Sequence, residues 1–434
     1  MRIARGVAEA RKLLRRDSGS TSSVTGVGSH ILAVEKILNQ VRESGDDALR
    51  ELTAQFDGQT IDAIEVPRAA FDQARDAVPV GLIDALEMAA DRIRKYHRAV
   101  LPKTWIDHTE GYGELVIPVD RVGAYVPGGT APLMSTALMT AIPARIAGVR
   151  EVVMASPPGA DGLPAPAVLV AADIAGVDRV FRVGGAQAIA AMAYGTKTIP
   201  RVDVVCGPGS IYVTLAKRLV YGDVGIDGLF GPTETLLIAD DHANPTLCAA
   251  DLLAQAEHDV LARPVLITTS SSLAETVERE VSMRVQCLDR SAIATRAVEE
   301  QGCIVVVDNL DQAFALGNEF APEHMCLMLE NPWGYASQVK NAGAVFLGDF
   351  SYEVLGDYVA GPSHVMPTGG TARFGSGLGV RAFLKFTPVV GLDDATSAEV
   401  SKAAAIIARA EGLTGHAEAA EIRKELDLGQ GEAQ

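Results

Sequence analysis

Short runs of β-branched residues alternate with helix-like segments over most of the middle of the chain, and this alternation restricts the fold more than any other feature. Residues 180–183 (Val-Phe-Arg-Val) lead into Gly184-Gly185 and an alanine-rich helix, and residues 202–205 lead into Gly207-Pro208-Gly209 and a further helix. Similar units begin at residues 152–154, 236–238, 265–267 and 304–307. This repetition is typical of parallel sheets covered by helices. Because the units are too numerous for one sheet, we predict two α/β domains.

The two ends of the chain follow a helical pattern instead. Apolar residues recur at helical spacing through residues 31–52, a second helical stretch covers residues 83–97, and residues 395–425 return to this pattern. Residues 1–16 carry six basic side chains but no continuous apolar core, so they do not resemble a secretory signal. We interpret them as an amphipathic arm that packs on a partner, with a transit peptide as the alternative. The tail after Leu426 should fray.

The charge balance and the cysteines exclude several classes of protein. With 38 Lys and Arg against 55 Asp and Glu, the net charge is −17, whereas a general nucleic-acid binder needs a basic surface. The five cysteines form no CxxC pair, which argues against a disulfide scaffold or a thiolate zinc site. Prolines interrupt the uncharged stretch at residues 122–144, so it should not span a membrane. We predict a cytoplasmic protein that binds neither nucleic acid nor membrane.

Three glycine-rich turns follow predicted strands. They are Tyr125-Val-Pro-Gly-Gly129, Gly184-Gly-Ala-Gln187 and Gly207-Pro-Gly-Ser210. Open parallel sheets bind ligands beyond the carboxyl ends of their strands, and backbone amides in such turns favour anionic groups. None of the turns matches the dinucleotide fingerprint G-x-G-x-x-G, so a purely structural role in tight turns explains the glycines equally well.

Four clusters that combine a carboxylate with an imidazole lie far apart along the chain. They are Glu257 with His258, Glu323 with His324, Asp357 with His364, and Glu411 with His416. Gln255 and His258 share a predicted helix face and could bind a metal, although glutamine is a poor zinc ligand and a solvated histidine fits the spacing as well. Glu323 and His324 would diverge on a strand and act on different protons, or else lie in a surface turn. These patterns alone indicate an α/β enzyme with a metal site assembled from several segments.

Seven blocks in a fixed order make the chain resemble the histidinol dehydrogenase family. They lie at residues 122–129, 183–190, 207–209, 255–258, 321–324, 356–358 and 411–416. With Gly45-Asp-Asp-Ala and Phe56-Asp-Gly58, the resemblance extends from about Gly45 to the C-terminal helices. The resemblance implies a zinc-dependent, NAD-linked dehydrogenase that completes histidine biosynthesis. Such an enzyme oxidises L-histidinol to the aldehyde and then to L-histidine, with two NAD⁺ in sequence.

The resemblance also implies an architecture. It consists of two incomplete Rossmann-like parallel-sheet domains with small helical domains at both ends of the chain, in an intertwined homodimer. We expect an N-terminal helical arm at residues 1–20 and a helical region at 21–105. A first α/β domain, with the zinc and catalytic residues, should consist of residues 106–127 plus 233–378, and a second α/β domain, on the NAD side, of residues 128–232. Residues 379–434 should form a C-terminal helical dimerisation segment.

Positions that match the family's motifs receive individual roles from the resemblance. The implied zinc ligands are Gln255, His258, Asp357 and His416, the last from the partner subunit. The implied acid–base pair is Glu323 and His324. The substrate would contact Thr233, His364 and Glu411 as well as Gln255, His258, His324, Asp357 and His416. The NAD contacts would be Tyr125, Gln187 and Ser210. In this interpretation the metal is mainly a template, His324 removes the hydroxyl proton, and Glu323 activates the water that hydrates the aldehyde.

Several positions depart from the family pattern. Ser210 replaces the usual Asn, Thr233 the commoner Ser and Gly228 the usual Met, and Arg381-Ala382-Phe383 lacks an acidic residue before Phe. One alternative is therefore a paralogue that resembles sulfopropanediol 3-dehydrogenase and oxidises another polar alcohol. A zinc hydrolase, in which Glu323 activates metal-bound water, and a scaffold without catalytic activity are further alternatives.

Overall fold

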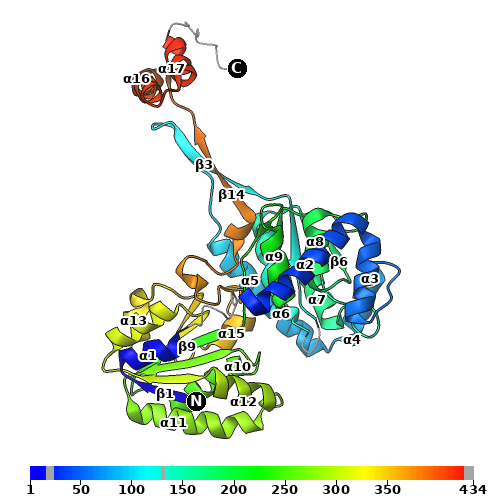
Figure 1. Ribbon diagram of the computed structural model, residues 1–434, viewed down its shortest axis with the longest axis vertical. Helices are drawn as coiled ribbons and strands as arrows, with labels where there is room; N and C mark the ends of the chain where they lie inside the picture. The colour runs from blue at the N-terminus through cyan, green and yellow to red at the C-terminus, as the bar shows by residue number, and fades with distance from the viewer. Residues whose placement is uncertain (16–23, 129–131, 425–434) are drawn as a thin grey trace. The chain divides into compact units, whose positions relative to one another are not determined.

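Two parallel sheets and one smaller sheet organise the chain in the computed structural model, which describes residues 1–15, 24–128 and 132–424 (Figure 1). Both parallel sheets belong to a first unit, formed by Met1–Leu101 and Pro118–Phe383. The smaller sheet lies in a second unit, formed by Pro102–Ile117 and Leu384–Gln434. Gly129, the last residue of the first glycine-rich turn, and the tail after Leu426 lie outside the described residues.

The six-stranded parallel sheet has helices on both faces. Its strands, in spatial order, are β1 (Arg2–Arg5), β11 (Cys303–Val306), β10 (Arg263–Thr268), β9 (Glu234–Ala239), β12 (His324–Met328) and β13 (Ala344–Leu347). One face packs under α10 (Pro245–Ala256), α11 (Ser271–Arg284) and α12 (Ser291–Glu300), and the other under α1 (Val7–Leu14) and α13 (Leu310–Phe320). Every residue of β9 is buried, because a strand covered on both faces has no solvent side.

The five-stranded parallel sheet is covered by a second set of helices. Its strands, in spatial order, are β6 (Arg179–Phe181), β5 (Glu151–Ala155), β4 (Arg121–Tyr125), β7 (Val204–Cys206) and β8 (Gly225–Ile226). The helices within this part of the chain are α6 (Met134–Ala147), α7 (Pro166–Ala175), α8 (Gly185–Tyr194) and α9 (Ile211–Val220). Among the N-terminal helices, α2 (Val24–Ser44) and α3 (Asp46–Asp57) pack on α8, whereas α4 (Arg68–Ala77) and α5 (Val80–Ala99) pack on α7.

Both parallel sheets share one strand order. Numbered along the chain from β4 and from β9, the strands of each sheet run 3-2-1-4-5, and β1 is added at one edge of the larger sheet. This is the Rossmann order without its last strand, and its direction reverses beside the first strand. The prediction of an α/β fold with two incomplete Rossmann-like sheets is therefore confirmed.

The second unit is small. Its sheet contains β2 (Trp105–Asp107), β3 (Tyr112–Pro118) and β14 (Leu384–Val390), and its helices are α16 (Asp394–Ala410) and α17 (Thr414–Glu421). The two helices pack through a small core of Ala405, Ala408 and Ala417, against which the partly buried Ala420 also packs.

The remaining short helices of the described chain are α14 (Pro332–Tyr335), α15 (Glu353–Tyr358), η1 (Val285–Cys287), η2 (Ala336–Gln338), η3 (Thr371–Arg373), η4 (Val380–Phe383) and η5 (Ile422–Lys424). Among the described residues, no helix is both long and apolar enough to cross a membrane.

Several predicted boundaries need correction. The expected C-terminal helical segment at 379–434 includes strand β14, which pairs with β3, and residues 106–117, expected in the first α/β domain, belong with it to the second unit. The expected helical arm at residues 1–20 begins instead as strand β1, which pairs in parallel with β11, and only Val7–Leu14 is helical; residues 16–20 lie outside the described part. Strand β4 pairs with β5 and β7, so residues 121–125 belong to the five-stranded sheet and not to the zinc-side domain expected at 106–127. The strands β1, β4 and β14 each have a partner strand that is distant in sequence, and local spacing does not reveal such a pairing.

We predict that Ala4→Asp destabilises the first unit, because Ala4 is 1% exposed and lies in the core between β1, α1 and α13. A carboxylate there has no partner, and its burial should lower the free energy of unfolding by about 3 kcal/mol. Ile3 is 42% exposed on the same strand, so Ile3→Asp is the matched control and should cost less than about 1 kcal/mol. Urea unfolding at one protein concentration measures both, and equal losses would contradict the packing of β1.

Candidate active site

The candidate catalytic residues gather at the amino ends of strands β9 and β12. Thr233 precedes β9, and Glu323 precedes His324, the first residue of β12, which lies opposite Thr235 in the sheet. Helix α10 follows β9 and returns toward the amino end of the strand, so its last turn carries Gln255 to the same edge. We expected ligand sites at carboxyl ends, and the six-stranded sheet instead uses the opposite edge for this cluster.

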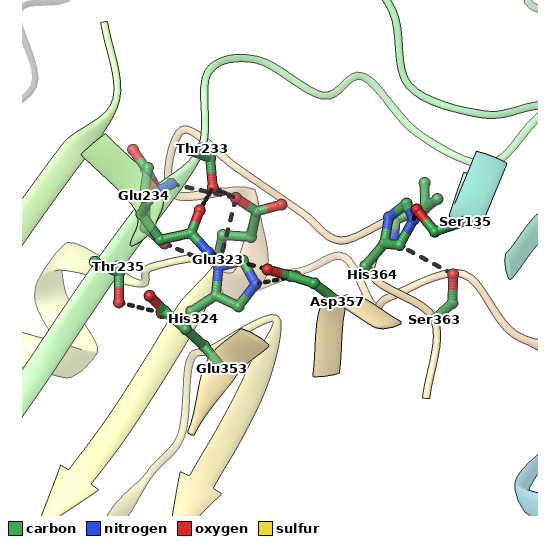
Figure 2. A network of polar contacts seen from close by, with 12 residues as sticks. Ser135, Thr233, Glu234, Thr235, Glu323, His324, Glu353, Asp357, Ser363 and His364 are labelled. Carbon is green, nitrogen blue, oxygen red and sulfur yellow. Dashed lines mark hydrogen bonds and ion pairs between the residues drawn. The ribbon is translucent and has the colours of Figure 1, made fainter. Parts of the chain in front are cut away.

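A network of short polar contacts surrounds Glu323 (Figure 2). The hydroxyl Oγ1 of Thr233 lies 2.6 Å from Glu323 Oε2 and 2.7 Å from Gln255 Oε1, and the backbone N of Glu234 donates to Glu323 Oε2 at 3.2 Å. The Thr233 hydroxyl has one proton and both neighbours are acceptors, so it donates to one of them at a time. Burial raises the pKa of Glu323, and it outweighs the opposing effect of His324 and Thr233.

The imidazole of His324 lies between acceptors on both sides. Its Nδ1 is 3.3 Å from the carbonyl oxygen of Glu234 and 3.7 Å from Glu323 Oε2, and its Nε2 is 3.3 Å from Asp357 Oδ1. The ring stacks on Phe346 with 5.8 Å between the ring centroids. Burial alone would lower the pKa of His324, but the carboxylates of Glu323 and Asp357 raise it above the usual value.

Asp357, near the end of α15, joins the remaining imidazoles to the cluster. Its Oδ2 accepts a hydrogen bond of 3.3 Å from Gln255 Nε2. Burial would raise the pKa of Asp357, but the hydrogen bond from His324 and the positive potential of His324, His364 and His258 hold it below its usual value. A carboxylate among three imidazoles is therefore present as the anion.

The structure places His258 and His364 beside this anion by different means. His258 lies in the turn after α10 rather than on the helix, where its backbone N donates to Gln255 O at 3.1 Å, and it keeps an exposed edge. Partial burial lowers the pKa of His258 against the effect of Asp357. His364 Nε2 lies 3.2 Å from Ser135 Oγ on α6, and burial likewise lowers the pKa of His364. Both rings are thus favoured as neutral imidazoles.

Three of the four expected zinc ligands, Gln255, His258 and Asp357, therefore belong to one cluster. The fourth, His416, lies exposed on α17 in the second unit, and Glu411 is the exposed C-cap residue of α16 in the same unit. The roles of His416 and Glu411 at the site stay predictions. Elsewhere Asp240, Asp241 and His242 lie close enough to share an ion, but they lie at the surface beyond β9, where acidic groups need no ion.

The expected cofactor residues lie at carboxyl strand ends of the five-stranded sheet. The hydroxyl of Tyr125, the last residue of β4, accepts a hydrogen bond of 3.0 Å from Gly185 N at the start of α8. Gln187 is buried on α8, and Ser210 is the exposed N-cap residue of α9. These turns follow β4, β6 and β7, and the strand order reverses between β4 and β7, which is where Rossmann-like sheets bind ligands.

Glu353 and its partner Thr235 are not among the residues that the sequence motifs single out. Glu353 is fully buried behind His324, and its Oε2 accepts a hydrogen bond of 2.5 Å from Thr235 Oγ1. Burial raises the pKa of Glu353 to about 8. Its spacing of four residues from Asp357 on α15 was the available signal, since residues four apart share a helix face.

Comparisons with known proteins agree with the resemblance. A family model described as histidinol dehydrogenase matches residues 22–424. The chain is 52% identical over 394 residues to histidinol dehydrogenase of Thermus thermophilus, covering 90% of this chain and 94% of that protein. It is 48% identical over 430 residues to histidinol dehydrogenase of Synechococcus sp., covering 98% of this chain and 99% of that protein. A crystal structure of histidinol dehydrogenase from Elizabethkingia anophelis matches with a TM-score of 0.92 at 34% identity, covering 98% of both chains. The chain therefore belongs to the histidinol dehydrogenase family.

Proposed function

We propose that this protein oxidises L-histidinol through the aldehyde to L-histidine, the last step of histidine biosynthesis, with NAD⁺ and zinc in the cytoplasm. The observation that carries the proposal is the convergence of Gln255, Asp357 and the Glu323–His324 pair in one cluster. These residue types supply metal ligands and two separate proton-transfer groups, which an alcohol-to-acid oxidation needs. The similarity to named histidinol dehydrogenases supports the same substrate.

The donor groups of the cluster fit a zinc ion. Gln255 offers an amide oxygen, Asp357 an ionised carboxylate and His258 an imidazole that burial favours as neutral, the form that binds metals. We propose that His416 of the partner subunit is the fourth ligand. Zinc, when bound, would orient the amino alcohol and lower the pKa of imidazoles beside it.

His324 is the base that we propose for the alcohol proton. The carbonyl oxygen of Glu234 accepts from Nδ1, so in the neutral ring that nitrogen carries the proton. The carboxylates of Glu323 and Asp357 raise the pKa of His324 in the metal-free site, and binding of Asp357 to zinc would reduce this effect and leave Nε2 to take up the substrate proton. Asp357 Oδ1 lies beside Nε2 and would stabilise the imidazolium that forms. Stacking on Phe346 holds the ring in this orientation, so the base is positioned before the substrate arrives.

Glu323 is the group that we propose for hydration of the aldehyde. Thr233 Oγ1 and Glu234 N both contact Oε2, and we assign Oε1 to the attacking water. The raised pKa makes this carboxylate a stronger base than an exposed glutamate. Thr233 replaces the commoner Ser but keeps its hydroxyl 2.6 Å from Glu323, so the departure from the family pattern preserves this contact.

At the five-stranded sheet, Tyr125, Gln187 and Ser210 are the residues that we propose to bind NAD⁺, which accepts the hydride.

For the second unit we propose a homodimer contact. Its helices enclose only a small alanine core, while Ile406 and Ile407 on α16 are 69% and 58% exposed. Apolar side chains that are exposed in this way are typical of a surface that a second copy covers.

The experiment that tests the proposed function measures NADH formed per L-histidinol consumed, before and after removal of metal by a chelator. We expect two NADH per L-histidinol, loss of turnover in the apoprotein, and recovery on addition of Zn²⁺. Turnover of dihydroxypropanesulfonate instead would identify the paralogous dehydrogenase. Hydrolytic turnover independent of NAD⁺ would identify a hydrolase.

We predict that Glu323→Gln separates the two oxidation steps. The amide keeps the size of the side chain but cannot accept a proton, so single-turnover oxidation of the aldehyde should slow on the order of 100-fold while alcohol oxidation slows less than about 10-fold. Glu330→Gln, at an exposed acid after the same strand, is the control and should change neither step. Equal losses in both half-reactions would contradict the role of Glu323.

A third prediction concerns the shared site. If His416 acts in the partner's site, mixing Glu323→Gln and His416→Asn proteins after denaturation should restore formation of L-histidine, the product of aldehyde oxidation, since each mixed dimer has one intact site. Random assortment in equal amounts should restore about a quarter of the sites. Refolding each variant alone is the control. No recovery, with mixed dimers verified by differential tags, would exclude His416 as a shared residue.

A further inference from the structure

A buried ion pair lies beneath one of the glycine-rich turns. Lys217 on α9 pairs with Asp227, which follows β8, and their side chains are 2% and 0% exposed. The ammonium also lies 4.8 Å from the centre of the Phe230 ring. Neither charged residue belongs to the site residues described above, although both lie beside the turn formed by residues 207–210, here called the Gly207 turn.

The pair engages both backbone polar groups of Gly207. Lys217 Nζ donates to Gly207 O at 3.0 Å, and Gly207 N donates to Asp227 Oδ2 at 2.8 Å. Gly207 itself has φ +112° and lies against the Tyr125 carbonyl oxygen, with which a Cβ would collide. The turn, which follows β7, therefore has a fixed orientation beside the end of β4, and two side chains hold it there.

A contribution to stability does not explain why this buried ion pair is present. Removing two charges from water costs about as much as their attraction returns, and apolar pairs of similar volume often stabilise a protein equally well. What apolar side chains cannot supply is a donor for the carbonyl and an acceptor for the amide of one glycine. Those two hydrogen bonds set the peptide planes at the start of the Gly207 turn, and thereby the amides that precede α9.

We propose that Lys217 and Asp227 are positioning residues that hold the Gly207 turn in the conformation that receives the diphosphate of the dinucleotide cofactor. The inference rests on the proposed function, since NAD⁺ binding at this turn is part of it. Because the two charges neutralise each other, they position the turn through hydrogen bonds and not through net charge. The loop that leads from Asp227 to Thr233 has an anchor of its own, the 2.6 Å hydrogen bond from Gly231 N to Thr368 Oγ1, so substrate binding should not depend on the pair.

Two double variants separate hydrogen bonding from charge. K217M/D227L removes both side-chain contacts with Gly207, and we expect its Kd for NAD⁺ to rise on the order of 10-fold or more, because small misplacements of a binding group are costly. K217Q/D227N keeps a donor and an acceptor without charge, and its Kd should stay within about 3-fold of the wild-type value. Calorimetric titration of the full-length, zinc-loaded proteins with NAD⁺ and, separately, with L-histidinol gives both affinities.

The control pair is Arg42 and Asp223, an exposed ion pair between α2 and the turn before β8. R42M/D223L should leave both affinities unchanged. In K217M/D227L, zinc content and the Kd for L-histidinol should also stay at wild-type values, which a general loss of structure would not permit. If K217M/D227L is not recovered folded, K217M/D227N takes its place; it loses the hydrogen bond from Lys217, and its Kd for NAD⁺ should rise about 5-fold, above the limit set for K217Q/D227N.

The outcomes distinguish this inference from the proposed function. Wild-type protein that binds no NAD⁺ would overturn both. Wild-type protein that binds and reduces NAD⁺, with unchanged affinity in K217M/D227L or in its replacement, would overturn only the positioning role. Equal weakening in K217M/D227L and K217Q/D227N would also overturn it, because hydrogen bonds to Gly207 would then not be what matters.

Discussion

Contacts between buried carboxylates and the imidazole of His324 are the interaction on which the candidate site depends. Inside a protein a charge without a partner is costly, so Glu323 and Asp357 must be placed where His324 can offset them. The ring meets these demands from two sides, at Nδ1 and Nε2. These contacts hold three segments together: the amino end of β12, the loop before β9 and the end of α15.

The two parallel sheets have the same strand order, but they carry their candidate site residues at opposite ends of the strands. The five-stranded sheet presents its glycine-rich turns at carboxyl ends, beside the reversal between β4 and β7. The six-stranded sheet presents the catalytic cluster at amino ends, because α10 and α15 return Gln255 and Asp357 to that edge. His364 contacts Ser135 on α6, so the two halves of the first unit meet beside the cluster.

The departures from the family pattern have local physical explanations at two positions. Gly228 adopts φ +154°, and a Cβ there would lie 2.8 Å from the Phe230 ring, so the ring occupies the space that a larger residue would need. Thr233 keeps the hydroxyl that contacts Glu323 and Gln255. The changes therefore alter packing near the site while its hydrogen bonds are retained. Nothing in the structure explains why Ser210 replaces the usual Asn.

The sequence by itself determined the class of fold, because apolar runs bounded by glycine, proline and aspartate report local backbone preferences directly. It also singled out Glu323, His324, Gln255, His258 and Asp357 through their ordered motifs. Only the tertiary structure decided that Arg2–Arg5 completes one sheet, that β4 belongs to the other, and that Glu353 lies behind His324. It alone placed Lys217 and Asp227 around Gly207. Strand pairing and the pairing of buried charges join residues far apart in sequence, and their energies depend on burial, which local spacing does not encode.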